Sequence, residues 1–227
     1  APFSRMVKTS DVEAILDRSM KQSDRYRIMR ENGATESEIR KAFDTKTEMQ
    51  MYSWKGMVDT VMTPMDSIRY HKSFLRTGFM AMDSRTGYVK AYVGGIDFKS
   101  FQYDMVAAGR RQIGSTIKPF LYTLAMEDGF SPCDIAPNVQ PHLLDESGNV
   151  WSPRNASKAR IGEDVTLRWG LANSNNWISA WLMDKLSPSA LVRLMHSFGI
   201  KNKIDAVISL CLGPADVSVE EMVTAYS

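Results

Sequence analysis

The chain has 227 residues, of which 44% are hydrophobic, so it can bury a core in one large domain or in one domain with a smaller appendage. Its 28 basic and 26 acidic residues leave a net charge of +2 and form no cluster of like charges, which argues against a nucleic-acid-binding protein. No run of about 18 apolar residues occurs, so we expect contact with a membrane only through a segment outside this chain.

The first fifty residues predict two helices, each beginning at a capping box. Ser10 pairs with Glu13 in the first box and Thr35 with Glu38 in the second. The apolar stripes of both helices are narrow, which favours a peripheral or linking element. From residue 48 to 54 the pattern becomes strand-like, and "MTPMDSIRY" then adds a proline turn and a helix. We therefore place a boundary in this region.

The stretch "TGFMAMDSRTGYVKAYVGG", residues 77–95, predicts a β-hairpin. Two runs rich in aromatic and β-branched residues flank a turn at residues 83–87. Because an isolated two-stranded hairpin is only marginally stable in water, we expect further strands or helices to cover it.

The rest of the chain is mainly helical. One helix is specified in detail, with Ser187 as N-cap, Pro188 in the first turn and Gly199 as the stop. A box formed by Ser218 and Glu221 opens the last helix, for which the sequence supplies no stop signal. We therefore expect the chain to end inside a larger domain.

The motif "GSTIKPF" carries the first candidate for chemistry. Ser115 and Lys118 are three residues apart, which places them on one face of a helix within mutual reach. Pro119 is tolerated only near a helix start, so the helix is expected to begin at about Ser115. There the free N–H groups and the helix dipole favour negative charge on the serine oxygen or on its adduct. The alternative is an N-cap serine followed by a solvated lysine.

Lys118 must be neutral to accept a proton, so its pKa must be lowered from the ordinary value near 10.4. Phe120 and Leu121 are candidates for the necessary burial, and Arg111 is a candidate for a nearby positive charge.

The motif "ANSNNW" lies between two helical runs and carries the second candidate. Ser174 can relay a proton, and Asn176 can hold a peptide amide. The alternative is a helix-junction cap. A second SxN triplet, at residues 147–149, is interpreted as a turn.

The sequence gives little support for catalysis by histidine, for metal binding by cysteine or for a bound cofactor. His71, His142 and His196 stand in no recognisable motif and no GxSxG elbow occurs, which argues against a Ser/His/Asp triad. Cys133 and Cys211 lack metal-like partners, and either a disulfide or two free thiols is compatible with the sequence. Phosphate-binding loops are absent, so no cofactor is expected.

Together, "GYVKAYVGG", "RRQIGSTIKPFLYTLAMEDGFSP", "WSPRN", "VTLRWGLANSNNWISAWL" and "SLCLGPADVSVEEMVTAYS" resemble the transpeptidase domain of class A, bifunctional penicillin-binding proteins, in order and spacing. The resemblance implies an α/β fold of the α+β type, like that of the serine β-lactamases, with an antiparallel sheet flanked by helices. It also implies a helical connection over residues 1–47, an interdomain linker of the Bacteroides type over 48–76, and a transpeptidase domain over 77–227.

The resemblance further implies D,D-transpeptidase chemistry on the stem peptides of peptidoglycan, with acylation by β-lactams. Ser115 would be the acylated nucleophile, Lys118 its base, Ser174 the proton shuttle and Asn176 a substrate-binding residue. The parent protein would carry a glycosyltransferase domain and be anchored in the inner membrane, with this domain on the periplasmic side.

The sequence departs from the family pattern in its third motif, because no KTG triplet follows Ser174. The RTG triplets at residues 76–78 and 85–87 precede the nucleophile and are interpreted as decoys. We therefore expect the C-terminal strands to be missing from this chain and its own activity to be crippled. No glutamate-bearing loop follows "SNN", which favours a transferase over a β-lactamase. A non-catalytic scaffold and a β-lactam-binding sensor remain as alternatives.

Overall fold

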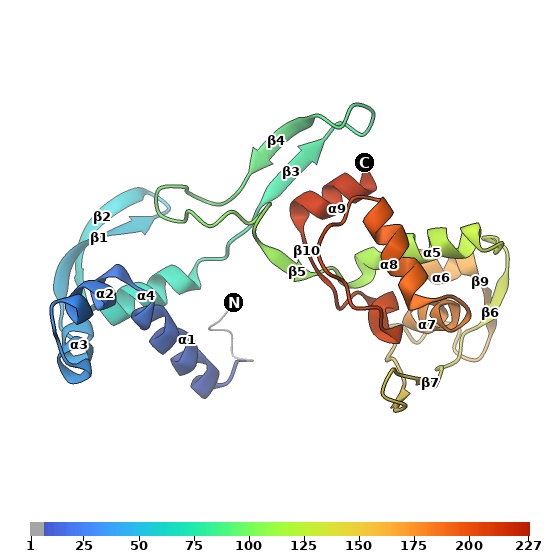
Figure 1. Ribbon diagram of the computed structural model, residues 1–227, viewed down its shortest axis with the longest axis horizontal. Helices are drawn as coiled ribbons and strands as arrows, with labels where there is room; N and C mark the ends of the chain where they lie inside the picture. Colours follow the sequence, from blue (N-terminus) through green and yellow to red (C-terminus); the bar gives the residue numbers. More distant parts are fainter. Residues whose placement is uncertain (1–6) are drawn as a thin grey trace. The chain divides into compact units, whose positions relative to one another are not determined.

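The structure is a computed structural model that describes residues 7–227, and the chain divides into two compact units, Ala1–Arg76 and Thr77–Ser227 (Figure 1). Over its described residues, the first unit consists of α1 (Thr9–Lys21), α2 (Asp24–Glu31), α3 (Glu36–Phe43), β1 (Thr47–Ser53), β2 (Gly56–Met62) and α4 (Pro64–Ser73). Met20, Ile39 and Phe43 form a small buried core in this unit, with Met65 and Ile68 of α4 packed against it. None of the helices described over residues 7–227 has the length and apolar character needed to cross a bilayer.

The helix starts of the first unit confirm one predicted capping box and contradict the other. Thr35 accepts from the backbone of Glu38, whose side chain returns to the backbone of Thr35, so the α3 box is present. The Ser10 box is wrong, because α1 begins at Thr9 with Lys8 as N-cap and Ser10 already lies inside the first turn. The prediction of two helices is also wrong, since Ser23 caps α2 as an additional short helix.

Thr35→Ala is expected to lower the free energy of unfolding of the first unit by about 0.5–2 kcal/mol, because it leaves backbone N–H groups of α3 without their cap. Ser10→Ala is the matched control and should have little effect, since α1 has no side-chain cap. Urea unfolding of both variants tests this. Equal effects of the two substitutions would contradict the assignment of the cap.

The strand expected at residues 48–54 is β1, and it forms a hairpin with β2, which was not predicted. β1 pairs antiparallel with β2 from Thr47↔Met62 to Ser53↔Gly56. Gly56, with φ of 107°, supplies the left-handed turn residue. The helix expected after the proline turn is α4, which begins with Pro64 itself behind the Thr63 N-cap.

The second unit is mixed α and β, with small antiparallel ladders, which confirms the predicted fold class. Its strands are β3 (Phe79–Met82), β4 (Val89–Val93), β5 (Arg110–Gln112), β6 (Ile135–Pro137), β7 (Leu143–Leu144), β8 (Val150–Trp151), β9 (Asp164–Thr166) and β10 (Asp216–Ser218). Its helices are η1 (Gly114–Ile117), α5 (Lys118–Glu127), α6 (Leu167–Ala172), α7 (Asn176–Lys185), α8 (Pro188–Ser197), η2 (Ile208–Leu212) and α9 (Val219–Tyr226).

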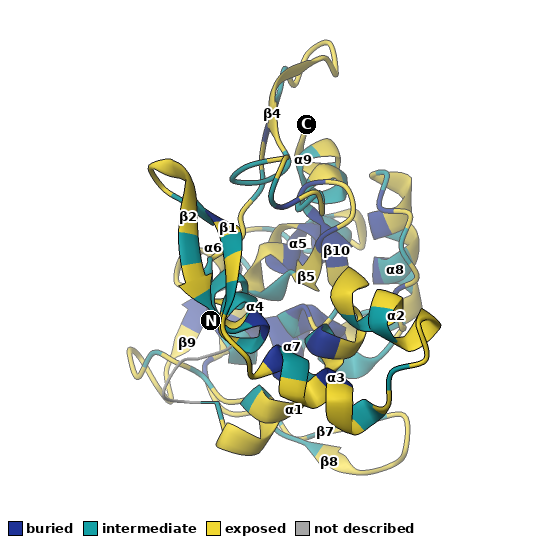
Figure 2. Cartoon of the chain, turned by 90° about the vertical axis from the view of Figure 1, so that its left-hand side faces the viewer, coloured by how far each residue is buried: buried dark blue, intermediate teal, exposed yellow. Residues whose placement is uncertain are grey.

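Each ladder of the second unit joins two strands. The predicted hairpin is β3 with β4, in register from Phe79↔Val93, and β5 pairs with β10, β6 with β9, and β7 with β8. The whole of β4 is exposed, as the yellow ribbon in Figure 2 shows. The β5–β10 pair matters for the site, because it joins the segment before Ser115 to the segment that leads into α9.

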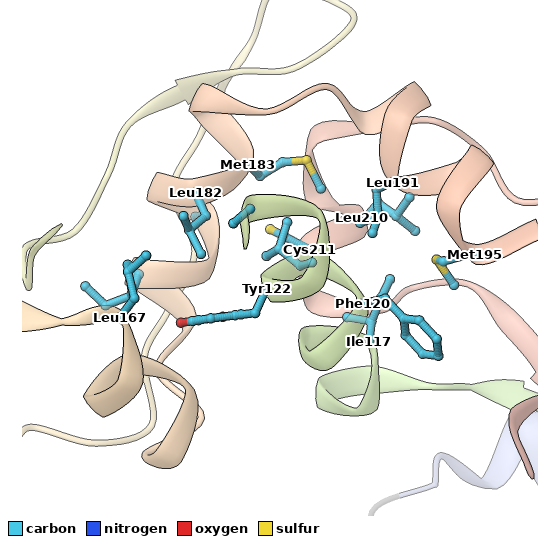
Figure 3. Packing of buried hydrophobic residues seen from close by; sticks show 14 of the residues in the cluster. Ile117, Phe120, Tyr122, Leu167, Leu182, Met183, Leu191, Met195, Leu210 and Cys211 are labelled. Carbon is cyan, nitrogen blue, oxygen red and sulfur yellow. The ribbon is translucent and has the colours of Figure 1, made fainter. Parts of the chain in front are cut away.

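The core of the second unit surrounds α5. Ile117, Phe120, Leu121 and Tyr122 are buried among side chains from α6, α7, α8 and η2 (Figure 3). A helix with apolar residues all round must be enclosed by others, and this enclosure gives α5 its place. α8 and α9 begin where predicted, with Ser187 and Ser218 as N-caps, although the Ser187 side chain makes no capping hydrogen bond.

Candidate active site

Ser115 is exposed and lies in the 3-10 turn η1, just before α5. Gly114 precedes it with φ of 54°, and its N–H donates to the carbonyl of Gly213 at 2.9 Å. On the other side, the hydroxyl of Tyr226 donates to the carbonyl of Thr116 at 2.6 Å. The serine is thus carried on a turn that the C-terminal segment of the chain holds from both sides.

Lys118 is the first residue of α5, and only 1% of its surface is exposed. Its Nζ donates to the carbonyl of Ser174 at 2.6 Å, to Ser174 Oγ at 3.1 Å and to Asn176 Oδ1 at 2.7 Å. An ammonium group has three protons, so these acceptors satisfy it completely. The structure therefore brings Lys118 together with both residues of the second motif.

Burial lowers the pKa of Lys118 to about 8. Phe120 and Leu121 contribute to the enclosing core, as the sequence suggested, whereas Arg111 is exposed on β5 and does not contribute to the lowering. Burial also raises the pKa of Cys211 to about 12, so this neighbouring thiol stays neutral. A substantial fraction of Lys118 is thus able to act as a base slightly above neutral pH.

Ser174 and Asn176 lie at the junction of α6 and α7. Ser174 adopts a left-handed conformation with φ of 48°, unusual for a residue other than glycine. The backbone N–H of Asn176 donates to Asn155 Oδ1 at 3.1 Å, and its Nδ2 donates to the carbonyl of Arg154 at 2.8 Å. The "WSPRN" stretch therefore fixes the Asn176 amide so that its oxygen faces Lys118.

The predicted contact between Ser115 and Lys118 is not a hydrogen bond in this structure. Within residues 7–227 the Ser115 hydroxyl has no hydrogen-bond partner, and the three protons of Lys118 go to the second motif. The physical reason is the enclosure of α5, which directs the lysine side chain toward the α6–α7 junction. An exposed hydroxyl, a buried amine of lowered pKa and a second hydroxyl bonded to that amine are the groups that acyl transfer requires.

Sequence reasoning missed several residues that shape this site. Arg154 and Asn155 belong to the "WSPRN" stretch, but no role was predicted for them. Gly213 and Tyr226 have no feature in the sequence that indicates a functional role, apart from their positions beside helix ends. The interpretation of residues 147–149 was right, since they form a turn closed by Asp145. The RTG triplet at residues 85–87 lies in the turn between β3 and β4.

The histidines and cysteines do not form a rival site in the described part of the chain. His142 Nδ1 lies 2.6 Å from Ser152 Oγ in an exposed pair without a carboxylate, and His196 Nδ1 lies 2.6 Å from the carbonyl of Ile200. Cys133 and Cys211 are free thiols, which resolves the alternative left open by the sequence. Over residues 7–227 no cluster of His, Cys, Asp and Glu could hold a metal ion.

Two protein-family models match the chain, one over each of its two units. The model of the penicillin-binding protein middle domain matches residues 1–75, and that of the penicillin binding protein transpeptidase domain matches residues 77–210. The chain is 29% identical to penicillin-binding protein 2D of Bacillus subtilis (strain 168) over 227 residues, which is 100% of this chain and 32% of that protein.

Other relatives match about two thirds of the chain. The chain is 34% identical to penicillin-binding protein 1A of Rickettsia conorii over 150 residues, which is 65% of this chain and 19% of that protein. The crystal structure of penicillin-binding protein 1A from Haemophilus influenzae aligns with a TM-score of 0.62 and 26% identity, over 66% of this chain and 22% of that one. The chain thus spans 32% or less of the length of these relatives.

Proposed function

We propose, from the premise that this chain belongs to the penicillin-binding proteins, that it carries the acyl-transfer site of a D,D-transpeptidase that cross-links peptidoglycan stem peptides. One observation carries the proposal: Lys118, buried and of lowered pKa, is bonded to Ser174 and Asn176 beside the turn that bears Ser115. A structural lysine would be expected at the surface, because burying an ammonium group is costly.

The first half of the proposed reaction is acylation of Ser115. Neutral Lys118 accepts the hydroxyl proton while Ser115 Oγ bonds to the carbonyl carbon of the penultimate D-alanine of a donor stem peptide. The bond from that carbon to the nitrogen of the terminal D-alanine then breaks. The leaving nitrogen receives a proton through Ser174 Oγ, which lies 3.1 Å from Lys118 Nζ.

The second half transfers the acyl group. An amine of a neighbouring stem peptide attacks the ester carbon, and the bond to Ser115 Oγ breaks, which restores the hydroxyl and forms the cross-link. Asn176 has one amide proton beyond that given to Arg154, and this proton is available to the peptide backbone of the donor. A β-lactam would follow the first half only and remain as an acyl-enzyme.

The proposal extends to the parent protein. We assign it to class A, with a linker of the type found in the Bacteroides group over residues 48–76, a helical connection over residues 1–47 and the transpeptidase domain from residue 77. A glycosyltransferase domain in the same protein and attachment to the inner membrane on its periplasmic side belong to this assignment. No cofactor enters the reaction.

Treatment of the full-length protein with benzylpenicillin tests the proposal. The mass of the peptide bearing Ser115 is expected to rise by one benzylpenicillin, and Ser115→Ala should prevent this. Ser174→Ala should slow labelling by about a hundredfold, since it removes a proton relay. Ser147→Ala is the matched control, because this serine stands in the other SxN triplet, within a turn.

The rival function, a non-catalytic scaffold, gives the opposite results. A protein that stays unlabelled at Ser115 while remaining folded would contradict the transpeptidase. Labelling followed by rapid release of hydrolysed penicillin would instead indicate a β-lactamase. A slowly reversed adduct on Ser115 is the result that supports transfer chemistry.

A further inference from the structure

Asn138 is a buried asparagine outside the site described above. It directly follows β6 and none of its surface is exposed. Its Nδ2 donates to the carbonyls of Ala159 and Arg160 at 3.0 and 2.7 Å, and its Oδ1 accepts from Asn175 Nδ2 at 2.8 Å. One side chain thus ties the loop before β9 to the middle residue of the "SNN" motif.

The direction of this asparagine pair is fixed by its partners. Two carbonyl groups face Asn138 Nδ2, so the amide cannot be reversed and Oδ1 must face Asn175. Two backbone N–H groups, those of Trp177 and Ile178, face Asn175 Oδ1 at 2.9 and 3.1 Å, so Asn175 Nδ2 must face Asn138. The pair is therefore a single polar network without an alternative arrangement.

Asn175 stands between the two residues that contact Lys118. Its backbone N–H donates to the carbonyl of Gly170 at 2.9 Å, and its side chain caps α7. Ser174, just before it, holds the left-handed conformation with φ of 48°. Such a conformation persists only where the surrounding structure determines it. The anchored Asn175 adds to the backbone hydrogen bonds that Ser174 makes with Leu171 and Lys118.

We propose that Asn138 is a positioning residue for acyl transfer, which holds Ser174 and Asn176 against Lys118 by anchoring Asn175. The inference rests on the proposed function, because it assigns Asn138 a part in that reaction. Without Asn138, Asn175 Nδ2 and two carbonyls lose their buried partner, and the α6–α7 junction can relax. The acceptors of Lys118 would then move and water would enter beside it.

Asn138→Leu in the full-length protein tests the inference, because leucine has the same branched shape and no hydrogen-bonding groups. Acylation by a fluorescent penicillin is followed at several concentrations, which separates the acylation rate constant from the non-covalent dissociation constant. We expect the rate constant to fall about tenfold or more and the dissociation constant to change little. The pH midpoint of acylation should rise, since Lys118 would be less buried.

Four further variants make the test specific. Met195→Ala, in the core on α8, controls for loss of stability and should keep the wild-type rate constant and pH midpoint. Asn175→Leu should slow acylation at least as much as Asn138→Leu, because it also removes the cap of α7. The double variant should be no slower than the slower single variant. Asn138→Ser removes the same two donors and provides the measurement if Asn138→Leu does not fold.

The possible results separate the two proposals. If the wild-type protein is not acylated, the proposed function fails and the role of Asn138 fails with it. If the wild-type protein is acylated but folded Asn138 variants keep its rate constant and pH midpoint, only the role of Asn138 is overturned. Slowing no greater than in Met195→Ala would likewise show a purely structural residue.

Discussion

Lys118→Met is expected to reduce acylation of Ser115 by about 10²–10⁴-fold, the range typical for loss of a general base. In the wild-type protein only neutral Lys118 accepts a proton, so the rate should rise about tenfold per pH unit and level off near the pKa of about 8. Quenched labelling with a fluorescent penicillin from about pH 6 to 10 measures this profile.

The same variant should also change how stability depends on pH. The pKa of Lys118 is about 8 in the folded protein against 10.5 as the ordinary value, so the unfolded chain binds the proton more tightly. The free energy of unfolding of the wild type should therefore rise between these pH values, by about 1–3 kcal/mol relative to Lys118→Met. Below pH 8 both states are protonated, so the difference between the two proteins should be constant there.

Lys185→Met is the matched control for both measurements, because this lysine is exposed on α7 and lies over the ring of Trp181. It should leave the pH profile of acylation and the slope of stability unchanged. A flat acylation profile in the wild type, or wild-type rates in Lys118→Met, would remove Lys118 from the proposed mechanism.

Local signals were sufficient for most helices and for the hairpin of β3 and β4. Thr35 and Ser218 mark true helix starts because a capping box is a contact between residues three positions apart. The Ser10 box failed because a helix that starts earlier places the same residues inside its first turn. β2 was not predicted, because its own residue pattern does not mark it as a strand. Its pairing with β1 and the turn at Gly56 define it.

The candidate site could be predicted only in part, because most of its contacts join segments that are far apart in the sequence. Sequence spacing identified Ser115 and Lys118, yet the hydrogen bond from Lys118 to Ser174 spans 56 residues and depends on how α5 packs. Nothing in the sequence singles out Asn138, because its contact with Asn175 joins two segments 37 residues apart. The stretch "WSPRN" was noted only because it resembles part of the transpeptidase domain. Its contact with Asn176 follows from the fold.

Gly213→Ala is expected to damage both stability and acylation, because the backbone of Gly213 touches the turn that carries Ser115. A Cβ atom on Gly213 would lie 2.1 Å from the carbonyl oxygen of Gly114, and Gly213 already has a left-handed φ of 75°. Backbone atoms cannot give way as a flexible side chain can, so the two segments must separate. We expect unfolding to become easier by about 2–4 kcal/mol, from strain and overpacking together.

Gly148→Ala separates the steric effect from the conformational one. Gly148 has a similar φ of 80°, but a Cβ atom there would meet nothing within 4 Å. This control should therefore lose only the left-handed cost of about 1 kcal/mol and keep the wild-type acylation rate. Folded Gly213→Ala should acylate about tenfold more slowly or worse, because displacement of the turn misaligns Ser115 with Lys118 and Ser174. Equal behaviour of the two variants in urea unfolding and penicillin labelling would mean that the contact between Gly213 and Gly114 does not position the nucleophile.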